Sequence, residues 1–439
     1  MRSAMNRGAP SSFRTVLAGG VIAGPGEARA GPCELVIRAG RIAAVRRPGR
    51  AAPVATVLDW RDRVVLPGLV NLHAHLEYTH LAHAIAGGTT FSAWVREIVA
   101  HKAASTEQVL VQARRRGAGW CLRTGTTTVL DIVSRTAGLP LEMERGPRLI
   151  EARELMDLPR GCDAQQQLDA ARDWLARGSE GAGGRPRRAP WRGRALAPHS
   201  PYACSNLLLS GSARLAAESG APWTLHLAES EEEWTAFERR QGGLWELGRA
   251  IRPEWGEGWC GRSPTAYVAG WLPPGGIVVH ANYLAPGDPD LLAAKAATVV
   301  HCPLSHAFFG HAPFPYAALL RAGVRVVLAT DSLATLPAGV EATRGYDLAA
   351  HAARFQRAHP GVAPADVLAM MTVAPAQALG RAGELGIVGE GTRADLFALP
   401  RRALGPRPEA WVAEWLEAGG EIGALATMVG GAVEWEAAE

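Results

Sequence analysis

The sequence predicts an α/β protein: a (β/α)8 barrel of the TIM type, together with a small β-sandwich domain formed from both chain ends. Two observations support this fold class. Apolar β-type runs alternate with stretches of helical length eight times between residues 67 and 384. Short extended runs separated by glycine and proline occupy residues 12–66 and 385–439. A chain of 439 residues is long enough to bury the cores of both units.

The two chain ends are expected to build the small domain. Residues 1–11 are interpreted as a flexible tail, and the runs "TVLAGGVIAG", "CELVIRAGRIAAV" and "TVLDWRDRVVLPG" follow it. The same style returns near the end of the chain in "GTRADLFALP" and "ALATMVGGAVEWE". Because short strands need partners to be stable, we expect the two sets to join in one unit.

The central region supplies the expected barrel. Its eight apolar runs are "GLVNLHAH", "GTTTVLDIV", "RLIEARELM", "RALAPHS", "WTLHLAES", "GGIVVHANY", "ATVVHCPLS" and "GVRVVLATDS". Stretches such as "TEQVLVQARRRGAGWCLR" and "SNLLLSGSARLAAESG" lie between them and are expected to be helices. The Gly-, Arg- and Pro-rich segment 176–194 is expected to be a solvated surface excursion with no assigned function.

Composition excludes several classes of function. The formal charge of +4 is spread over the chain without a basic run interleaved with aromatics, which argues against nucleic-acid binding. No uninterrupted apolar run approaches the length of a membrane span, and the N-terminus lacks the apolar region of a secretory signal. The six cysteines are scattered without a C-x-x-C pair, so a reduced, cytoplasmic setting is expected.

Polar side chains cluster where the predicted barrel strands end, which is where catalytic residues of such barrels lie. They are His73, His75, His199, His226, Glu229, His280, His301 and Asp331. His73 and His75 stand two residues apart, so in a strand both imidazoles face the same side and could share a divalent metal.

An H-x-H pair alone is weak evidence, and each neighbour also has a purely structural interpretation. His80 and His83 are expected to line or cover the site rather than bind metal. His280 could be a core histidine, and Glu231 to Glu233 could be the solvated start of a helix. Glu229 differs from these acidic residues because it is closest to His226, and a carboxyl in that place can shuttle protons.

Taken in order, "LPGLVNLHAHLE", "LHLAES", "VVHANY" and "LATDSLAT" resemble the motifs of the amidohydrolase superfamily. "APHSPYACS", "HCPLSH" and "GTRADLFAL" are similar to its branch of chlorohydrolases and of purine-type and adenosylhomocysteine-type deaminases. Many binuclear members carry a bridging lysine, but the only lysines here, Lys102 and Lys295, are not placed for that role. The resemblance therefore implies the mononuclear subtype.

The resemblance also implies a role for each site residue. His73, His75, His226 and Asp331 would hold one divalent metal ion per chain, expected to be zinc, with iron(II) or manganese as alternatives. Asp331 would accept a proton from the attacking water, His280 would hold that water, and Glu229 would protonate the substrate.

Substrate contacts are expected from His199, Trp94 and His306. In adenosylhomocysteine-type deaminases the stretch before the tryptophan is acidic, whereas Ser92 and Ala93 stand there in this chain. This departure indicates a changed pocket for the small-molecule substrate.

Three functions compete. The first is an aminohydrolase that converts a purine-, pterin- or nucleoside-like amine to its oxo form with release of ammonia. The second is a hydrolase of the same fold that acts on a chloro-substituted ring or on an amide. The third, a catalytically silent homologue, is disfavoured because every ligand type is present. A homodimer or larger homo-oligomer is expected from the resemblance.

Overall fold

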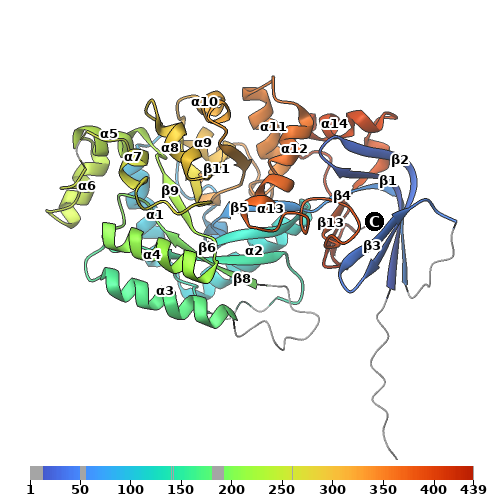
Figure 1. Ribbon diagram of the computed structural model, residues 1–439, viewed down its shortest axis with the longest axis horizontal. Helices are drawn as coiled ribbons and strands as arrows, with labels where there is room; N and C mark the ends of the chain where they lie inside the picture. Colours follow the sequence, from blue (N-terminus) through green and yellow to red (C-terminus); the bar gives the residue numbers. More distant parts are fainter. Residues whose placement is uncertain are drawn as a thin grey trace, which may run out of the picture.

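The computed structural model describes residues 13–49, 56–139, 141, 143–179, 192–259 and 261–438. The expected tail, residues 1–11, and most of the segment 176–194 lie outside these residues. Within that segment, residues 176–179 end a helix and 192–194 begin a strand, so the described parts are not an irregular excursion. Figure 1 shows the first strands and the last strands side by side at one end of the molecule, with the central region beside them.

Strands from both chain ends share one seven-stranded sheet. They are β1 (Phe13–Gly24), β2 (Glu27–Arg38), β3 (Arg41–Arg46), β4 (Thr56–Pro67), β13 (Leu396–Pro400), β14 (Ala426–Val429) and β15 (Ala432–Glu436), in the order β15-β14-β13-β4-β1-β2-β3. The strand β4 joins the two sets, because it pairs in parallel with β1 and antiparallel with β13. A sandwich of two separate sheets stays a prediction.

All eight strands predicted for the central region are present. β5 (Leu69–Ala74), β6 (Thr126–Val133), β7 (Arg148–Leu155) and β8 (Arg192–Pro198) form one parallel sheet in chain order. β9 (Thr224–Leu227), β10 (Ile277–His280), β11 (Thr298–His301) and β12 (Arg325–Leu328) form a second. Isolated parallel bridges between Ala74 and Asp331 and between Leu196 and Trp223 connect the edges of the two sheets.

Burial explains why these strands read as continuous apolar runs. Parallel strands are covered on both faces, so their side chains avoid water on each side. Val70, Leu130, Ile150, Val279 and Val327, from five different strands, pack in one cluster and are at most 4% exposed. These apolar side chains therefore fill the core between the strands.

Helices alternate with these strands. They are α1 (Phe91–Ala104), α2 (Glu107–Arg123), α3 (Ala164–Ser179), α4 (Asn206–Ser219), α5 (Glu231–Arg239), α6 (Gly243–Ile251), α7 (Pro264–Val268), α8 (Asp288–Ala294), α9 (Pro303–Phe309), α10 (Tyr316–Arg321), α11 (Leu348–Ala358), α12 (Pro364–Ala369), α13 (Val373–Ala378) and α14 (Trp411–Glu417). Hydroxyl caps begin several of them: Thr106 accepts from the amide of Val109, and Ser205 accepts from that of Leu208. None of the described helices is long and apolar enough to cross a membrane.

Candidate metal centre and active-site cavity

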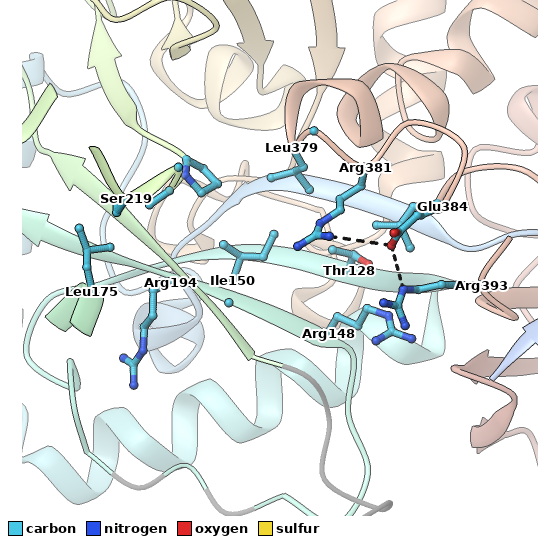
Figure 2. Close-up of a pocket in the computed structure, with 16 residues that line it drawn as sticks. Thr128, Arg148, Ile150, Leu175, Arg194, Ser219, Leu379, Arg381, Glu384 and Arg393 are labelled. Atoms are coloured by element: carbon cyan, nitrogen blue, oxygen red, sulfur yellow. Dashed lines mark hydrogen bonds and ion pairs between the residues drawn. The ribbon is translucent and has the colours of Figure 1, made fainter. Parts of the chain in front are cut away.

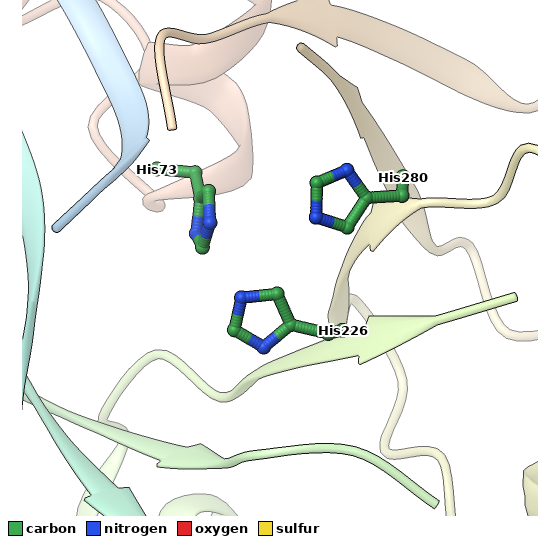
Figure 3. A group of neighbouring side chains, drawn as sticks. All are labelled: His73, His226 and His280. Carbon is green, nitrogen blue, oxygen red and sulfur yellow. The ribbon is translucent and has the colours of Figure 1, made fainter. Parts of the chain in front are cut away.

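Four histidines and one aspartate converge at the carboxyl ends of the central strands. His73 lies in β5 and His75 just after it, His226 lies in β9, and His280 ends β10. Asp331 follows β12 by three residues. None of the five is more than 7% exposed. Figure 3 shows the rings of His73, His226 and His280 turned toward a common space.

The distances between these side chains match those of a metal site. His75 Nε2 lies 3.3 Å from His226 Nε2, and Asp331 Oδ1 lies 3.3 Å from His73 Nε2 and 3.7 Å from His75 Nε2. In a tetrahedral zinc site with bonds of about 2.0–2.1 Å, neighbouring ligand atoms lie about 3.3–3.4 Å apart. The four groups can therefore face one ion with little movement.

The hydrogen bonds of the histidine rings also point to a cation site. Both ring nitrogens of His73 and Nε2 of His280 are buried without a hydrogen-bond partner, although buried polar groups are normally paired. His226 Nδ1 lies 2.8 Å from the carbonyl oxygen of His199. Because only a protonated Nδ1 can donate to that carbonyl, Nε2 of His226 keeps its lone pair for the site. The donor set suits a divalent ion.

Burial favours the neutral form of His75, His226 and His280, which is the form that binds a metal. Burial lowers the pKa of His75 and of His280 to about 3, and it lowers the pKa of His226 well below its ordinary value. The pKa of Asp331 is lowered too, but for a carboxyl a lower pKa favours the charged form. Burial alone would raise the pKa of Asp331, but the ring of His73, 3.3 Å away, and those of His280 and His75 hold that pKa well below its ordinary value, which favours the carboxylate.

The backbone is strained where it presents these groups. Asp331 has a φ of 60° and His280 a φ of 78°, a left-handed conformation that non-glycine residues rarely adopt. The amide of Asp331 donates to the carbonyl oxygen of His73 at 3.0 Å, which ties the end of β12 to β5. Such strain persists only where the surrounding structure holds it, and it is frequent at functional sites.

Glu229 lies at the edge of this cluster with its carboxyl 3.5 Å from Nε2 of His280. Burial raises its pKa well above the ordinary value, and the negative charges of Asp331 and Glu233 raise it further. The surroundings therefore shift these two carboxyls in opposite directions, favouring the protonated acid at Glu229 and the carboxylate at Asp331. Environments that separate two carboxyls in this way are typical of acid–base pairs.

Glu233 corrects the expectation that residues 231–233 are only a solvated helix start. Ser230 does cap α5, but Glu233 is fully buried. Its two oxygens accept hydrogen bonds from the amides of Ala228 and Glu229, at 3.1 and 2.8 Å. Glu233 therefore fixes the turn that carries Glu229.

A buried arginine supports the turn after His75. Arg114 of α2 donates to Asp131 and to Glu151, each at 2.8 Å, and its side chain is inaccessible to solvent. The second oxygen of Asp131 accepts from the amide of Leu76 at 3.0 Å. The position of the chain at His75 therefore depends on a charge network inside the protein.

A cavity of about 190 Å³ opens beside the cluster. It is lined by His75, His226, Glu229, His280 and Asp331, and also by the two predicted substrate contacts Trp94 and His199. Helices α1 and α6 and the segment before α7 supply apolar walls, which include Phe91, Leu244, Leu247, Ile251 and Trp255.

Other predicted residues do not line this cavity. His306 donates from Nε2 to the carbonyl oxygen of Ala312 in its own loop at 2.9 Å, and its role as a substrate contact stays a prediction. His80 bonds to Ser105 at 3.0 Å, and His83 is exposed, so neither covers the cavity as expected. Ser92 is buried, and its amide faces Glu232 at 3.2 Å.

Two cavity residues were missed by sequence reasoning. Lys102 of α1 and Glu154 of β7 both line the cavity and form an ion pair of 3.3 Å. Lys102 was considered only as a metal-bridging lysine, and Glu154 lies in a strand with alternating charges. The nearest signal was the rarity of lysine, since one of only two lysines reaches this cavity.

A larger cavity, of about 460 Å³, lies at the amino ends of β6, β7 and β8. Figure 2 shows its arginines, with Glu384 held between Arg381 and Arg393. None of the predicted site residues lines it. Its position at the end of the strands opposite the histidine cluster separates it from the candidate site.

Comparisons with known proteins agree with this architecture. The model of the amidohydrolase family matches residues 64–431. Over 387 residues the chain is 30% identical to a 5-methylthioadenosine/S-adenosylhomocysteine deaminase from Nitratidesulfovibrio vulgaris, which covers 85% of this chain and 80% of the relative.

Two solved structures share the fold. An adenosine deaminase from Xanthomonas campestris with bound zinc superposes with a TM-score of 0.76 at 21% identity, covering 96% of this chain and 92% of that one. A triazine hydrolase variant gives a TM-score of 0.77 at 18% identity, with coverages of 98% and 97%.

Proposed function

The chain belongs to the amidohydrolase family, and on that premise we propose that it is a metal-dependent aminohydrolase acting on a nucleoside-like heterocyclic amine. The observation that carries the proposal is the buried cluster of imidazoles, in which His73 and Nε2 of His280 have no hydrogen-bond partner, placed on the wall of a cavity beside two carboxyls whose pKa values are shifted in opposite directions. The relative from Nitratidesulfovibrio vulgaris, named for two adenine nucleosides, supports the substrate class.

His73, His75, His226 and Asp331 are the proposed ligands, and zinc is the proposed ion, with iron(II) and manganese as alternatives. When bound, a divalent ion supplies Lewis-acid activation of the water that attacks the substrate.

The protein's own groups would handle the protons. Ionised Asp331 takes a proton from the attacking water, and His280, through Nε2, orients that water. Protonated Glu229 gives its proton to the ring nitrogen beside the reacting carbon. The new carbon–oxygen bond forms and the exocyclic carbon–nitrogen bond breaks. The amino group takes the proton held by Asp331 and leaves as ammonia. The hydroxyl group formed by the attack returns its proton to Glu229, so the ring is left in its oxo form and both carboxyls regain their starting states.

We also infer that the two parallel sheets act as one closed (β/α)8 barrel spanning residues 67–384, since single bridges link both pairs of edges. Residues 12–66 and 385–439 would then form the small domain.

The test is ammonia release from purified protein whose metal content is measured, across adenine nucleosides, free purines, pterins and triazines. We expect about one metal ion per chain and ammonia from nucleosides. Chloride release from a chlorinated triazine without ammonia from any amine would contradict the proposal and favour a chlorohydrolase. Protein that takes up no metal would contradict the ligand assignment.

A further inference from the structure

Glu154 is a buried carboxylate on the cavity wall that the proposed chemistry does not use. It lies at the carboxyl end of β7 and is 9% exposed. Its Oε2 is 3.3 Å from Nζ of Lys102. Burial favours the neutral acid, but the Lys102 ammonium, together with His199, His75 and Ser134, outweighs it and holds the pKa of Glu154 down to about 2. The cavity therefore contains a permanently ionised acceptor.

His199 faces this carboxylate across a gap. Its Nε2 lies 4.0 Å from Oε1 of Glu154, which is beyond hydrogen-bond length. Its Nδ1 lies 2.9 Å from the hydroxyl oxygen of Ser200. When the Ser200 hydroxyl donates to Nδ1, Nε2 carries the hydrogen and is a donor. Both His199 and Glu154 line the cavity.

One hydroxyl group fits this gap. An atom about 2.8 Å from each partner can bridge two atoms 4.0 Å apart. A hydroxyl can accept from the imidazole N–H and donate to the carboxylate at the same time, whereas an ether, a thioether or a methylene cannot do both. Away from the metal cluster the cavity wall is largely apolar, with Phe91, Leu247 and Trp255 among its residues. A polar substituent of the substrate therefore has few other partners.

We propose that Glu154 and His199 form a hydroxyl-binding site that selects a heterocyclic amine carrying a sugar-like hydroxyl. Lys102 is a positioning residue, which keeps the Glu154 carboxylate ionised and oriented. This inference rests on the proposed function and deepens it, because it names the part of the substrate that is recognised. The ring of His199 lies beside that of His226, tilted by 32° with centroids 4.9 Å apart, so the site lies one side chain from the proposed metal ligands.

The test compares kcat/KM for adenosine with that for 2′-deoxy-, 3′-deoxy- and 5′-deoxyadenosine. For the wild type, we expect removal of one particular hydroxyl to lower kcat/KM by about ten- to a hundredfold, as for a lost hydrogen bond to a charged group. In Glu154→Gln the same removal should cost less than about threefold, because the acceptor is no longer charged.

Two controls separate recognition from folding. Glu34→Gln changes an equally buried carboxylate, paired with Arg46 at 3.0 Å in the seven-stranded sheet, and should leave the substrate ratios unchanged. The double variant Lys102→Met, Glu154→Leu removes both charges together, so it leaves no buried charge unpaired. It should show the same loss of discrimination if the single variant is unstable. Calorimetric binding of inosine and its deoxy analogues to metal-free protein should reproduce the ratios without turnover.

The outcomes are distinct. Wild-type discrimination that persists in Glu154→Gln, or its absence from the wild type, would overturn the hydroxyl site while leaving the deaminase intact. A metal-loaded wild type that deaminates none of the nucleosides would refute the proposed function and the hydroxyl site together.

Discussion

Replacing Arg114 with methionine removes the cation that two buried carboxylates share. Arg114 bonds to Asp131 and Glu151 at 2.8 Å each, and its side chain is fully buried. Methionine fills a similar volume without charge. Glu151 keeps Arg194 at 3.3 Å, whereas Asp131 keeps only the amide of Leu76. The variant therefore leaves Asp131 as a buried acid without a cation.

The expected loss of unfolding free energy is about 3–5 kcal/mol at pH 7, the usual cost of breaking a buried ion pair from one side. Part of it has a distinct pH dependence. Burial raises the pKa of Asp131 to about 6 even with Arg114 present. At pH 7, one unit above that pKa, ionisation of Asp131 lowers the free energy of the folded wild type by about 1.4 kcal/mol relative to its own protonated form. The unfolded chain, whose pKa is lower, gains more, so the wild type still loses stability as pH rises through 6. Without Arg114 the pKa exceeds 7 and this gain in the folded state disappears. At pH 5 Asp131 is protonated in both proteins, so the loss should shrink by about 1.4 kcal/mol.

Urea unfolding at pH 7 and pH 5, with metal content held constant, measures both quantities. Arg172→Met is the control, because its pair with Asp169 is exposed at 60% and 57% and should contribute less than about 1 kcal/mol. Adding Asp131→Asn to Arg114→Met should recover part of the loss. A loss below about 1 kcal/mol at pH 7, or an equal loss at both pH values, would refute the reasoning.

Three other predictions follow from single contacts. Glu229→Gln should lower kcat by about 10²–10⁴-fold with unchanged metal content, whereas His73→Ala should lower the amount of bound metal. Loss of metal from Glu229→Gln would show that Glu229 is a ligand. Burial raises the pKa of the Asp347 carboxyl to about 6. The stability contributed by its protonated form is therefore complete below about pH 4, and the free energy of unfolding should fall by about 3 kcal/mol as the pH rises through 6. Asp347→Asn keeps the side-chain oxygen that accepts from the Ala349 amide and caps α11. In urea unfolding from pH 4 to 7 this variant should not show the loss of stability at rising pH. A variant whose stability falls in parallel with that of the wild type would contradict the prediction. Gly117→Ala would place a methyl group 2.4 Å from Thr79 Oγ1 and 3.1 Å from Tyr346. Thermal unfolding should therefore show a destabilisation of about 1–3 kcal/mol. An unchanged melting temperature would show that α2 can shift to make room.

The eight central strands could be predicted because parallel strands are buried on both faces and appear as apolar runs. The metal cluster could be predicted because its members end those runs. For example, Asp331 directly follows "VRVVLAT", and in a barrel such positions meet at one end. Residues that end successive apolar runs in the sequence therefore lie close together in the folded protein.

Residues that reach the site from helices could not be found in this way. Lys102 lies in α1, 52 positions before its partner Glu154, and no local spacing links them. Glu233 belongs to a run of three glutamates, of which only the third turns inward to bond the backbone at Glu229. Whether a charged residue faces water or a neighbouring turn is decided by tertiary packing, which short patterns do not encode. For the same reason His306 looked equivalent to His199, although only His199 lines the cavity.

The strand β4 has a consequence for how the chain is made. One edge of β4 pairs with β1, and the other pairs with β13, where Leu66 lies opposite Phe397. During synthesis the second edge of β4 therefore has to wait until more than three hundred further residues have left the ribosome. An unpaired edge is a site for incorrect strand association, and such distant pairings form slowly. Truncation before β13 should leave that edge permanently open, so the last tenth of the chain would protect a strand near its beginning from aggregation.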